Sequence, residues 1–230
     1  MVIIAGGLAT RLGKLSAQTP KSMLRFSGKP FLQYQIELLR SKGIKKFVLC
    51  VGHFSEQIKQ YFGSGKDFGV QISYSDEGEK LLGTGGALKK AEDLLEDDFF
   101  IMWGDSYLLL DYKDIFKVYI KSEIQALMVV YKNFNERDKS NVVVKNNKVI
   151  LYDKWSISKD KVYIDNGVSI LNKKLLQCIP KDEVFALELI FKKLAQENNI
   201  AAYKAEQCFY EIGSVGGIKD FKDFVGSCYP

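Results

Sequence analysis

The N-terminal stretch of this chain constrains its fold more than any other feature. An apolar strand is predicted at residues 2–5, and the paired glycines Gly6 and Gly7 follow it directly. Glycine lets a ligand approach the backbone closely, and the N–H groups of such a loop can bind phosphate oxygens. Arg11 and Lys21 add a guanidinium fork and an ammonium charge in the residues that follow. The stretch therefore favours an α/β fold with a polyphosphate cradle after its first strand.

This loop matches neither of the two common glycine-rich phosphate motifs. No Gly-Lys-Ser/Thr closes it, as a P-loop requires, and the Gly-x-Gly-x-x-Gly pattern of dinucleotide-binding folds is absent. A glycine pair after a strand can also be a tight turn that binds nothing. Because Arg11 and Lys21 lie close in sequence to the glycines, we favour the phosphate site over the tight turn.

Strands and helices alternate along the chain as far as about residue 132. After the first strand, further strands are predicted at residues 46–51, 70–74, 99–103 and 125–131. The helices predicted between them are 31–42, 55–62 (with Ser55 as its cap), 84–95 and 112–121. This alternation predicts right-handed crossovers and a mostly parallel, doubly wound sheet.

The pattern becomes more antiparallel after residue 132. Residues 141–145 and 148–153 flank the polar pair Asn146 and Asn147, which predicts a hairpin. The later elements are strands at 162–170, 201–205 and 208–212 and helices at 182–198 and 216–225. We expect this part to form a small antiparallel lobe over the carboxyl edge of the sheet. It is not expected to fold alone, so residues 1–230 are predicted to be one domain.

Charge and composition exclude several classes of protein. The net charge of +5 is spread along the chain without a dense Lys/Arg block, which argues for a small anionic ligand and against nucleic acid. No apolar run reaches the length of a membrane span, and no signal peptide precedes the first strand. Four widely spaced cysteines indicate reduced thiols and a cytoplasmic protein. One histidine leaves no His-based metal cluster and no Ser-His-Asp triad.

A carboxylate follows the strand predicted at residues 99–103. Gly104 and Asp105 come directly after this strand, so Asp105 is predicted to lie at the carboxyl edge of the sheet, where ligands bind in open α/β folds. An acid there suits Mg²⁺, which takes few carboxylates and completes its coordination with phosphate oxygens. The alternative is that Asp105 caps a following helix or a turn.

A second glycine-rich segment begins the helix predicted at residues 84–95. Gly83, Thr84 and Gly85 place bare backbone N–H groups where a flat ligand could lie on them. The alternative is a glycine-rich helix start with Thr84 as its N-cap.

The N-terminal stretch resembles the signature of the sugar-1-phosphate nucleotidyltransferases. That signature reads Gly-x-Gly-Thr-Arg-Leu and, about ten residues later, Pro-Lys-Pro. In this chain Ala9 replaces the second signature glycine and Ser22 replaces the second proline. The resemblance continues in the family's order to about residue 224. It implies a Rossmann-like, GT-A-type α/β fold with a nucleotide-binding part, residues 1–132, and a sugar-phosphate-binding part, residues 133–230. The nucleotide-binding residues that it implies are Ala5, Gly6, Gly7, Leu8, Thr10, Arg11, Gly83, Thr84, Gly85 and Gly104.

Three later segments resemble the family's sugar-phosphate site. Asp153, Lys154 and Trp155 stand where the family has Glu-Lys-Pro, and residues 164–168 resemble Asn-Ala-Gly-Ile. Glu188 falls in the helix that follows a Ser-Leu-Glu segment in the family. The implied sugar-phosphate-binding residues are Lys21, Asp153, Lys154, Asn166, Gly167 and Glu188. The alternatives are a hairpin salt bridge, a turn and an exposed helix acid.

Residues 209–214 resemble an aromatic-x-Asp-x-Gly-Thr segment whose acid is the family's second metal ligand. Glu211 occupies that position with one more methylene, and Ser214 replaces the threonine. The resemblance implies Mg²⁺ held by Asp105 and Glu211. The alternative for Glu211 is a solvent-facing acid on an edge strand.

The resemblance implies that a sugar phosphate attacks the α-phosphorus of a nucleoside triphosphate, giving an NDP-sugar and pyrophosphate. Arg11, Lys21 and Asp105 are the implied catalytic residues.

The short chain and its Leu-Gly-Thr-Gly-Gly-Ala segment look most like guanylyltransferases for mannose or heptose 1-phosphate, so GTP and a hexose or heptose 1-phosphate are favoured. CTP, UTP or dTTP with another phosphorylated molecule stays open, as does a homodimer. Two other classes are a GT-A glycosyltransferase and a non-catalytic nucleotide-binding regulator.

Overall fold

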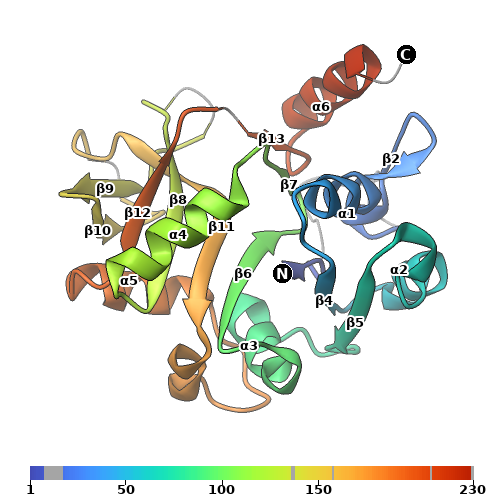
Figure 1. Ribbon diagram of the computed structural model, residues 1–230, viewed down its shortest axis with the longest axis horizontal. Coiled ribbons are helices and arrows are strands. Elements are labelled where there is room, and N and C mark those ends of the chain that lie inside the picture. Colours follow the sequence, from blue (N-terminus) through green and yellow to red (C-terminus); the bar gives the residue numbers. More distant parts are fainter. Residues whose placement is uncertain (8–17, 136–137, 157, 208, 229–230) are drawn as a thin grey trace.

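The computed structural model describes residues 1–7, 18–135, 138–156, 158–207 and 209–228 (Figure 1). The main sheet of these residues has nine strands in the order β5-β4-β1-β6-β11-β8-β12-β10-β9. Its first four strands are parallel, with Ile4 of the central strand beside Cys50 and Trp103. They are β5 (Gln71–Asp76), β4 (Lys46–Val51), β1 (Val2–Ile4) and β6 (Asp98–Trp103). This part agrees with the predicted parallel sheet, and the carboxyl ends of its strands meet at one edge.

The strands of the second half extend the same sheet. β11 (Tyr163–Asn172) runs antiparallel between β6 and β8 (Ala126–Lys132), and it therefore joins the two halves. β12 (Ala201–Ala205) is parallel to β8, and the hairpin of β10 (Lys148–Tyr152) and β9 (Val142–Lys145) completes the edge. The strands that were predicted to be antiparallel thus belong to the same nine-stranded sheet as the parallel strands.

The hairpin between β9 and β10 turns at two asparagines. Asn146 and Asn147 have φ angles of 50° and 56°, in the left-handed region. A two-residue turn with both residues there matches the right-handed twist of the flanking strands, and asparagine tolerates this conformation better than most residues. The predicted hairpin is confirmed.

Helices cover both faces of the sheet and bury their apolar residues against it. On one face, Ile36, Ile58 and Ile115 pack with the strands into one core cluster. The helices that carry them are α1 (Phe31–Ser41), α2 (Ser55–Phe62) and α4 (Tyr112–Ser122). On the other face, α3 (Gly83–Lys90) and α5 (Leu187–Gln196) form a second cluster around residues such as Leu88 and Phe191. Short 3₁₀ helices connect these elements at Lys21–Met23, Lys66–Phe68, Glu92–Leu94 and Lys173–Cys178.

The C-terminal helix α6 (Val215–Cys228) packs against the outer side of α1 (Figure 1). Phe221 of α6 contacts the rings of Phe26, Phe31 and Tyr34 edge-on. Phe26 belongs to a small hairpin of β2 (Arg25–Phe26) and β3 (Lys29–Pro30). A second small pairing, β7 (Ser106–Tyr107) with β13 (Tyr210–Glu211), places Glu211 opposite Ser106.

Several predicted helix ends differ from the observed ones. The helix expected at 84–95 ends at Lys90 and is followed by a 3₁₀ turn, and the helix expected from residue 182 begins at Leu187. Ser55 does not cap α2, because Phe54 takes the capping position with a φ of 60° and the Ser55 hydroxyl donates to Asp76. Local sequence does not reveal these endings, since contacts with distant residues decide them.

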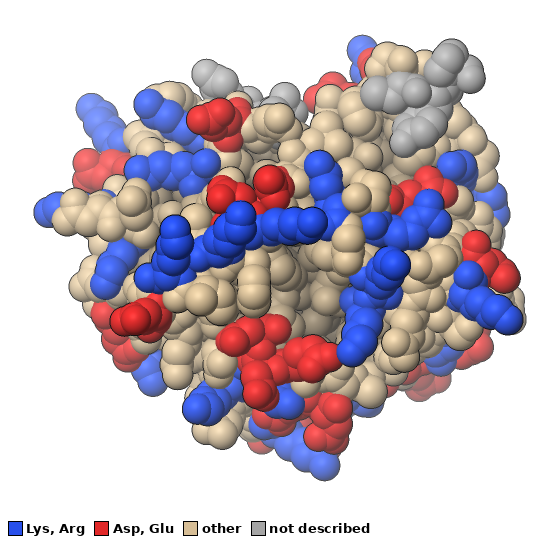
Figure 2. Space-filling model, viewed as in Figure 1, with Lys and Arg blue, Asp and Glu red and all other residues tan. Residues whose placement is uncertain are grey.

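Charged side chains of both signs cover the face of the molecule shown in Figure 2, with lysine and arginine side chains forming a band across its middle. Acidic side chains flank this band on both sides. In the described part of the chain, no helix is long and apolar enough to cross a membrane.

Candidate active site

A cleft lies where strands β1 and β6 end. A cavity of about 440 Å³ adjoins a larger, open cavity of about 1400 Å³. Lys21, Trp103, Asp105 and Lys154 line both cavities, so the two form one continuous cleft. Ligands bind at this edge in open α/β sheets, as the sequence predicted for Asp105.

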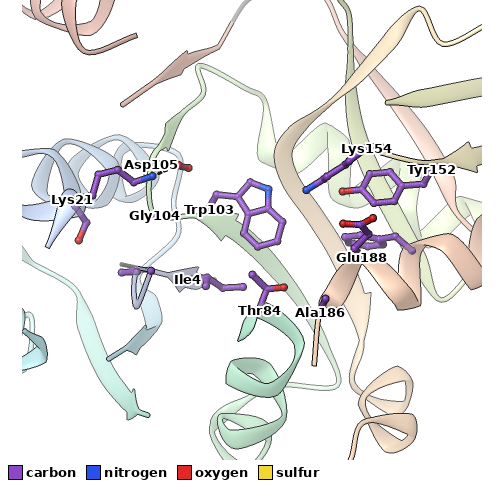
Figure 3. A pocket seen from close by; sticks show the side chains of 14 residues that line it. Ile4, Lys21, Thr84, Trp103, Gly104, Asp105, Tyr152, Lys154, Ala186 and Glu188 are labelled. Atoms are coloured by element: carbon purple, nitrogen blue, oxygen red, sulfur yellow. Dashed lines mark hydrogen bonds and ion pairs between the residues drawn. The ribbon is translucent and has the colours of Figure 1, made fainter. Parts of the chain in front are cut away.

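Lys21 and Asp105 meet at one end of the smaller cavity (Figure 3). The Lys21 Nζ atom lies 2.5 Å from Asp105 Oδ2, and both side chains are partly exposed. Gly104 allows this placement, because a β-carbon at residue 104 would lie 2.7 Å from the carbonyl oxygen of Ile4. The capping alternative for Asp105 is wrong for helix α4, since Asp111 accepts the N–H groups at its start.

Glu211 approaches this ion pair from strand β13. A β-carbon added to Gly213 would lie 2.8 Å from Glu211 Oε2, 3.3 Å from Asp105 Oδ2 and 3.6 Å from Lys21 Nζ. Glu211 also accepts hydrogen bonds from the N–H groups of Gly213 and Ser214 and from the Ser214 hydroxyl. Two carboxylates and one ammonium therefore converge around a residue without a side chain. Glu211 is partly buried and lines the larger cavity.

The glycine-rich start of α3 packs against the segment that leads into α5. The N–H groups of Gly85 and Gly86 donate to the carbonyl oxygen of Phe185, at 2.8 and 3.2 Å. Thr84 Oγ1 accepts from the N–H of Leu187 and makes no cap for its own helix. Thr84 still lines the smaller cavity. The glycines thus serve a close helix contact, and Thr84 is the member of this segment that reaches the cleft.

Aromatic rings and one ammonium group occupy the other end of the smaller cavity (Figure 3). The Lys154 Nζ atom lies 5.9 Å from the ring centroid of Trp103 and 5.6 Å from that of Tyr152. These distances are typical of cation–π contacts. Glu188 lines the cavity beside Lys154 and accepts a hydrogen bond from the indole N–H of Trp155. Lys154 therefore lies across the cleft from Lys21, and its charge acts on the Asp165 carboxylate, which lines the larger cavity with it.

Asp153 turns away from both cavities. Its carboxylate accepts from the hydroxyl of Ser156, the N–H of Trp155 and the ammonium of Lys161, and these hydrogen bonds hold its pKa well below the usual range. The Lys161 side chain is only 1% exposed. This is the salt-bridge alternative that the sequence left open.

Strand β11 is irregular where it passes the cleft. Its pairing with β8 shifts between Asp165 and Ser169, and Gly167 has a φ of 87°. A β-carbon at Gly167 would lie 2.7 Å from the Ser106 hydroxyl oxygen. The amide of Asn166 is buried and has no hydrogen-bond partner among the described residues. Asp165 lines the larger cavity, and burial raises the pKa of its carboxyl group.

The first loop is described up to Gly7. Ala5 and Gly7 line the smaller cavity, whereas Gly6 packs against the Glu77 carboxylate. Glu77 is buried and accepts from the N–H of Leu82, and burial raises its pKa. The predicted residues Leu8, Thr10 and Arg11 lie outside the described residues.

The structure thus brings together part of the predicted site. The predicted residues that line the cleft are Ala5, Gly7, Lys21, Thr84, Gly104, Asp105, Lys154, Glu188 and Glu211. The described ones that do not line it are Gly6, Gly83, Gly85, Asp153, Asn166 and Gly167.

Sequence reasoning missed several residues that line the cleft. Trp103, Tyr152 and Phe191 supply apolar walls, and Ala186 supplies backbone next to Thr84. Trp103 carries a usable signal, since a strand end before Gly-Asp is an unusual place for a large ring. Tyr152 and Phe191 carry none, because each resembles an ordinary core residue of its element.

The chain is similar to known nucleotidyl transferases in sequence and in fold. A model of the nucleotidyl transferase family matches residues 1–225. The chain is 32% identical to D-glycero-α-D-manno-heptose 1-phosphate guanylyltransferase from Aneurinibacillus thermoaerophilus, over 92% of each chain. The structure of HddC from Yersinia pseudotuberculosis with GMP-PN is similar at a TM-score of 0.80, with 27% identity and 97% of each chain covered. The structure of UDP-glucose pyrophosphorylase from Acinetobacter baumannii shares the fold at a TM-score of 0.79 and 17% identity, covering 100% of this chain and 93% of the other.

Proposed function

The chain belongs to the nucleotidyl transferase family, and from that premise we propose that it joins GTP and a heptose or hexose 1-phosphate into a GDP-sugar. The observation that carries this proposal is the arrangement of Lys21 and Lys154 at opposite ends of one cleft. Two separated cations suit two phosphorylated substrates. GTP and a heptose are favoured because relatives from two bacteria are named heptose 1-phosphate guanylyltransferases.

Asp105 and Glu211 fit a Mg²⁺ ion by their chemistry. Mg²⁺ is commonly held by one or two carboxylates together with substrate phosphates and water. Both carboxylates lie close to Gly213. A β-carbon on residue 213 would lie 2.8 Å from Glu211 Oε2 and 3.3 Å from Asp105 Oδ2. When bound there, Mg²⁺ would neutralise phosphate charge and help to align the reacting groups. The Lys21 ammonium pairs with Asp105, one of these two carboxylates.

The side chains of this cleft can promote the reaction without a general base. A phosphate monoester is already largely ionised at neutral pH, so its oxygen can attack the α-phosphorus directly. Lys21 and Arg11 would balance charge on the α-phosphoryl group and on the leaving pyrophosphate. Lys154 would hold the phosphate of the sugar, with Glu188 as an acceptor for sugar hydroxyl groups. Catalysis would then consist of positioning and charge stabilisation.

The experiment that tests this function is a panel of substrate pairs. Pyrophosphate release is measured with GTP, CTP, UTP or dTTP against mannose 1-phosphate, glucose 1-phosphate and D-glycero-α-D-manno-heptose 1-phosphate, each with MgCl₂. We expect release with GTP and a manno-configured sugar phosphate, and none when the sugar phosphate is omitted. Preference for another nucleotide would revise the base, and no release with any pair would overturn the function.

A further inference from the structure

Trp155 is an exposed aromatic residue at the edge of the cleft. The residue is 77% exposed, which is the highest value among the exposed large apolar residues of the described part of the chain. It lines the larger cavity next to Lys154, which lines both. The family motif that this segment resembles has proline at this position.

Two hydrogen bonds fix the position of Trp155. Its indole N–H donates to Glu188 Oε1 at 3.0 Å, which connects it to the first turn of α5. Its backbone N–H donates to Asp153 Oδ1 at 2.9 Å. The ring is therefore held in place although most of its surface faces solvent.

The turn that carries Trp155 is itself braced by a buried cation. Lys161 Nζ donates to the carbonyl oxygens of Asp153 and Ser156, at 2.9 and 2.6 Å, and to the Asp153 carboxylate at 3.1 Å. A buried ammonium needs such partners, because an unpaired one would be costly. The arrangement holds residues 153–156 in one conformation and presents Lys154 and Trp155 together.

We propose that Trp155 recognises the sugar ring of the sugar phosphate by packing its indole against the C–H face of the ring. The inference rests on the proposed function. It assigns to Trp155 the binding of the sugar ring, which lies next to the phosphate held by Lys154. An aromatic face is electron-rich and apolar, so it favours the C–H groups of a pyranose over its hydroxyl groups. Glu188 would fix the indole and accept from a hydroxyl group at the same time.

The test compares Michaelis constants for the two substrates. We expect Trp155→Ala to raise the KM for mannose 1-phosphate or heptose 1-phosphate about tenfold, because alanine leaves the C–H face of the sugar without an apolar surface to pack on. The KM for GTP should change less than about twofold, and Trp155→Phe should recover most of the loss. Phe116→Ala is the matched control, since Phe116 is an exposed ring on helix α4 and lines neither cavity.

A binding measurement gives an independent readout. The chain has two tryptophans, so the difference in emission between the wild-type protein and Trp155→Phe isolates the fluorescence of Trp155. Mannose 1-phosphate should change its emission, and inorganic phosphate, which has no sugar ring, should not. Two results together would overturn the inference in an enzyme that still turns over. One is an unchanged KM for the sugar phosphate in Trp155→Ala, and the other is a Trp155 emission that the sugar phosphate does not change. A raised KM for GTP alone would assign Trp155 to the base instead. A wild-type protein inactive with every pair would overturn the proposed function itself.

Discussion

Lys21 and Asp105 form an ion pair that lines the cleft. Their 2.5 Å contact is partly exposed, and pairs of this kind contribute little to stability. A ligand-binding role explains the pair better, because a bound phosphate and a divalent cation would each take one of these partners.

Neutralising Asp105 tests this interpretation. We expect Asp105→Asn to lower kcat about a hundredfold or more, because it removes a charge needed in the transition state, and to leave the melting temperature nearly unchanged. Turnover and thermal unfolding are measured on the same preparation, at several MgCl₂ concentrations. Glu96→Gln is the control, since it neutralises an exposed carboxylate paired with Lys46 on the surface. Near-wild-type turnover in Asp105→Asn would contradict the metal assignment.

At the residue scale, sequence predicted the side chains that follow strand ends. Asp105 comes two residues after strand β6, so its place at the edge follows from the local pattern, whereas Lys154 was assigned to the site by the resemblance alone. The orientation of Asp153 could not be predicted, because it depends on Lys161, which is buried by tertiary packing. The approach of Glu211 to Asp105 likewise depends on a pairing between distant strands, because Glu211 of β13 lies opposite Ser106 of β7.

At the element scale, helices α3 and α5 are coupled through glycines. Gly83 has a φ of 71°, and β-carbons at Gly85 and Gly86 would lie within 3 Å of neighbouring atoms. Sequence indicated a ligand-binding helix start here, whereas the structure shows a helix packed against residues 183–187. A close contact between two backbone segments leaves no periodic pattern in the sequence. The glycines that allow it therefore could not be distinguished from glycines that contact a ligand.

Gly86→Ala tests that coupling. Its β-carbon would lie 2.6 Å from the carbonyl oxygen of Glu183, so we expect a loss of about 1–3 kcal/mol in the free energy of unfolding. Gly226→Ala is the matched control, because it also lies in a helix but has open space around the added carbon. Alanine favours a helix there, so this variant should be neutral or more stable. Equal urea midpoints for the two variants would show that the α3 contact tolerates a side chain.

At the scale of the whole molecule, the two halves share one sheet and one cleft. Alternation of strands and helices was sufficient to predict the parallel half, because each crossover is local in sequence. The position of β11 between β6 and β8 was not predictable, since it joins strands that are far apart along the chain. That joint places Trp103 and Lys154 on the same cleft.

The most direct test of the whole account follows the oxygen atoms of the sugar phosphate. The protein is incubated with GTP, MgCl₂ and mannose 1-phosphate or heptose 1-phosphate carrying oxygen-18 in its phosphate group, and the products are followed by phosphorus NMR. Direct attack predicts a GDP-sugar whose two phosphorus signals both show the isotope shift, together with unlabelled pyrophosphate. Label in the pyrophosphate, or release of GDP or free phosphate without a GDP-sugar, would contradict the account.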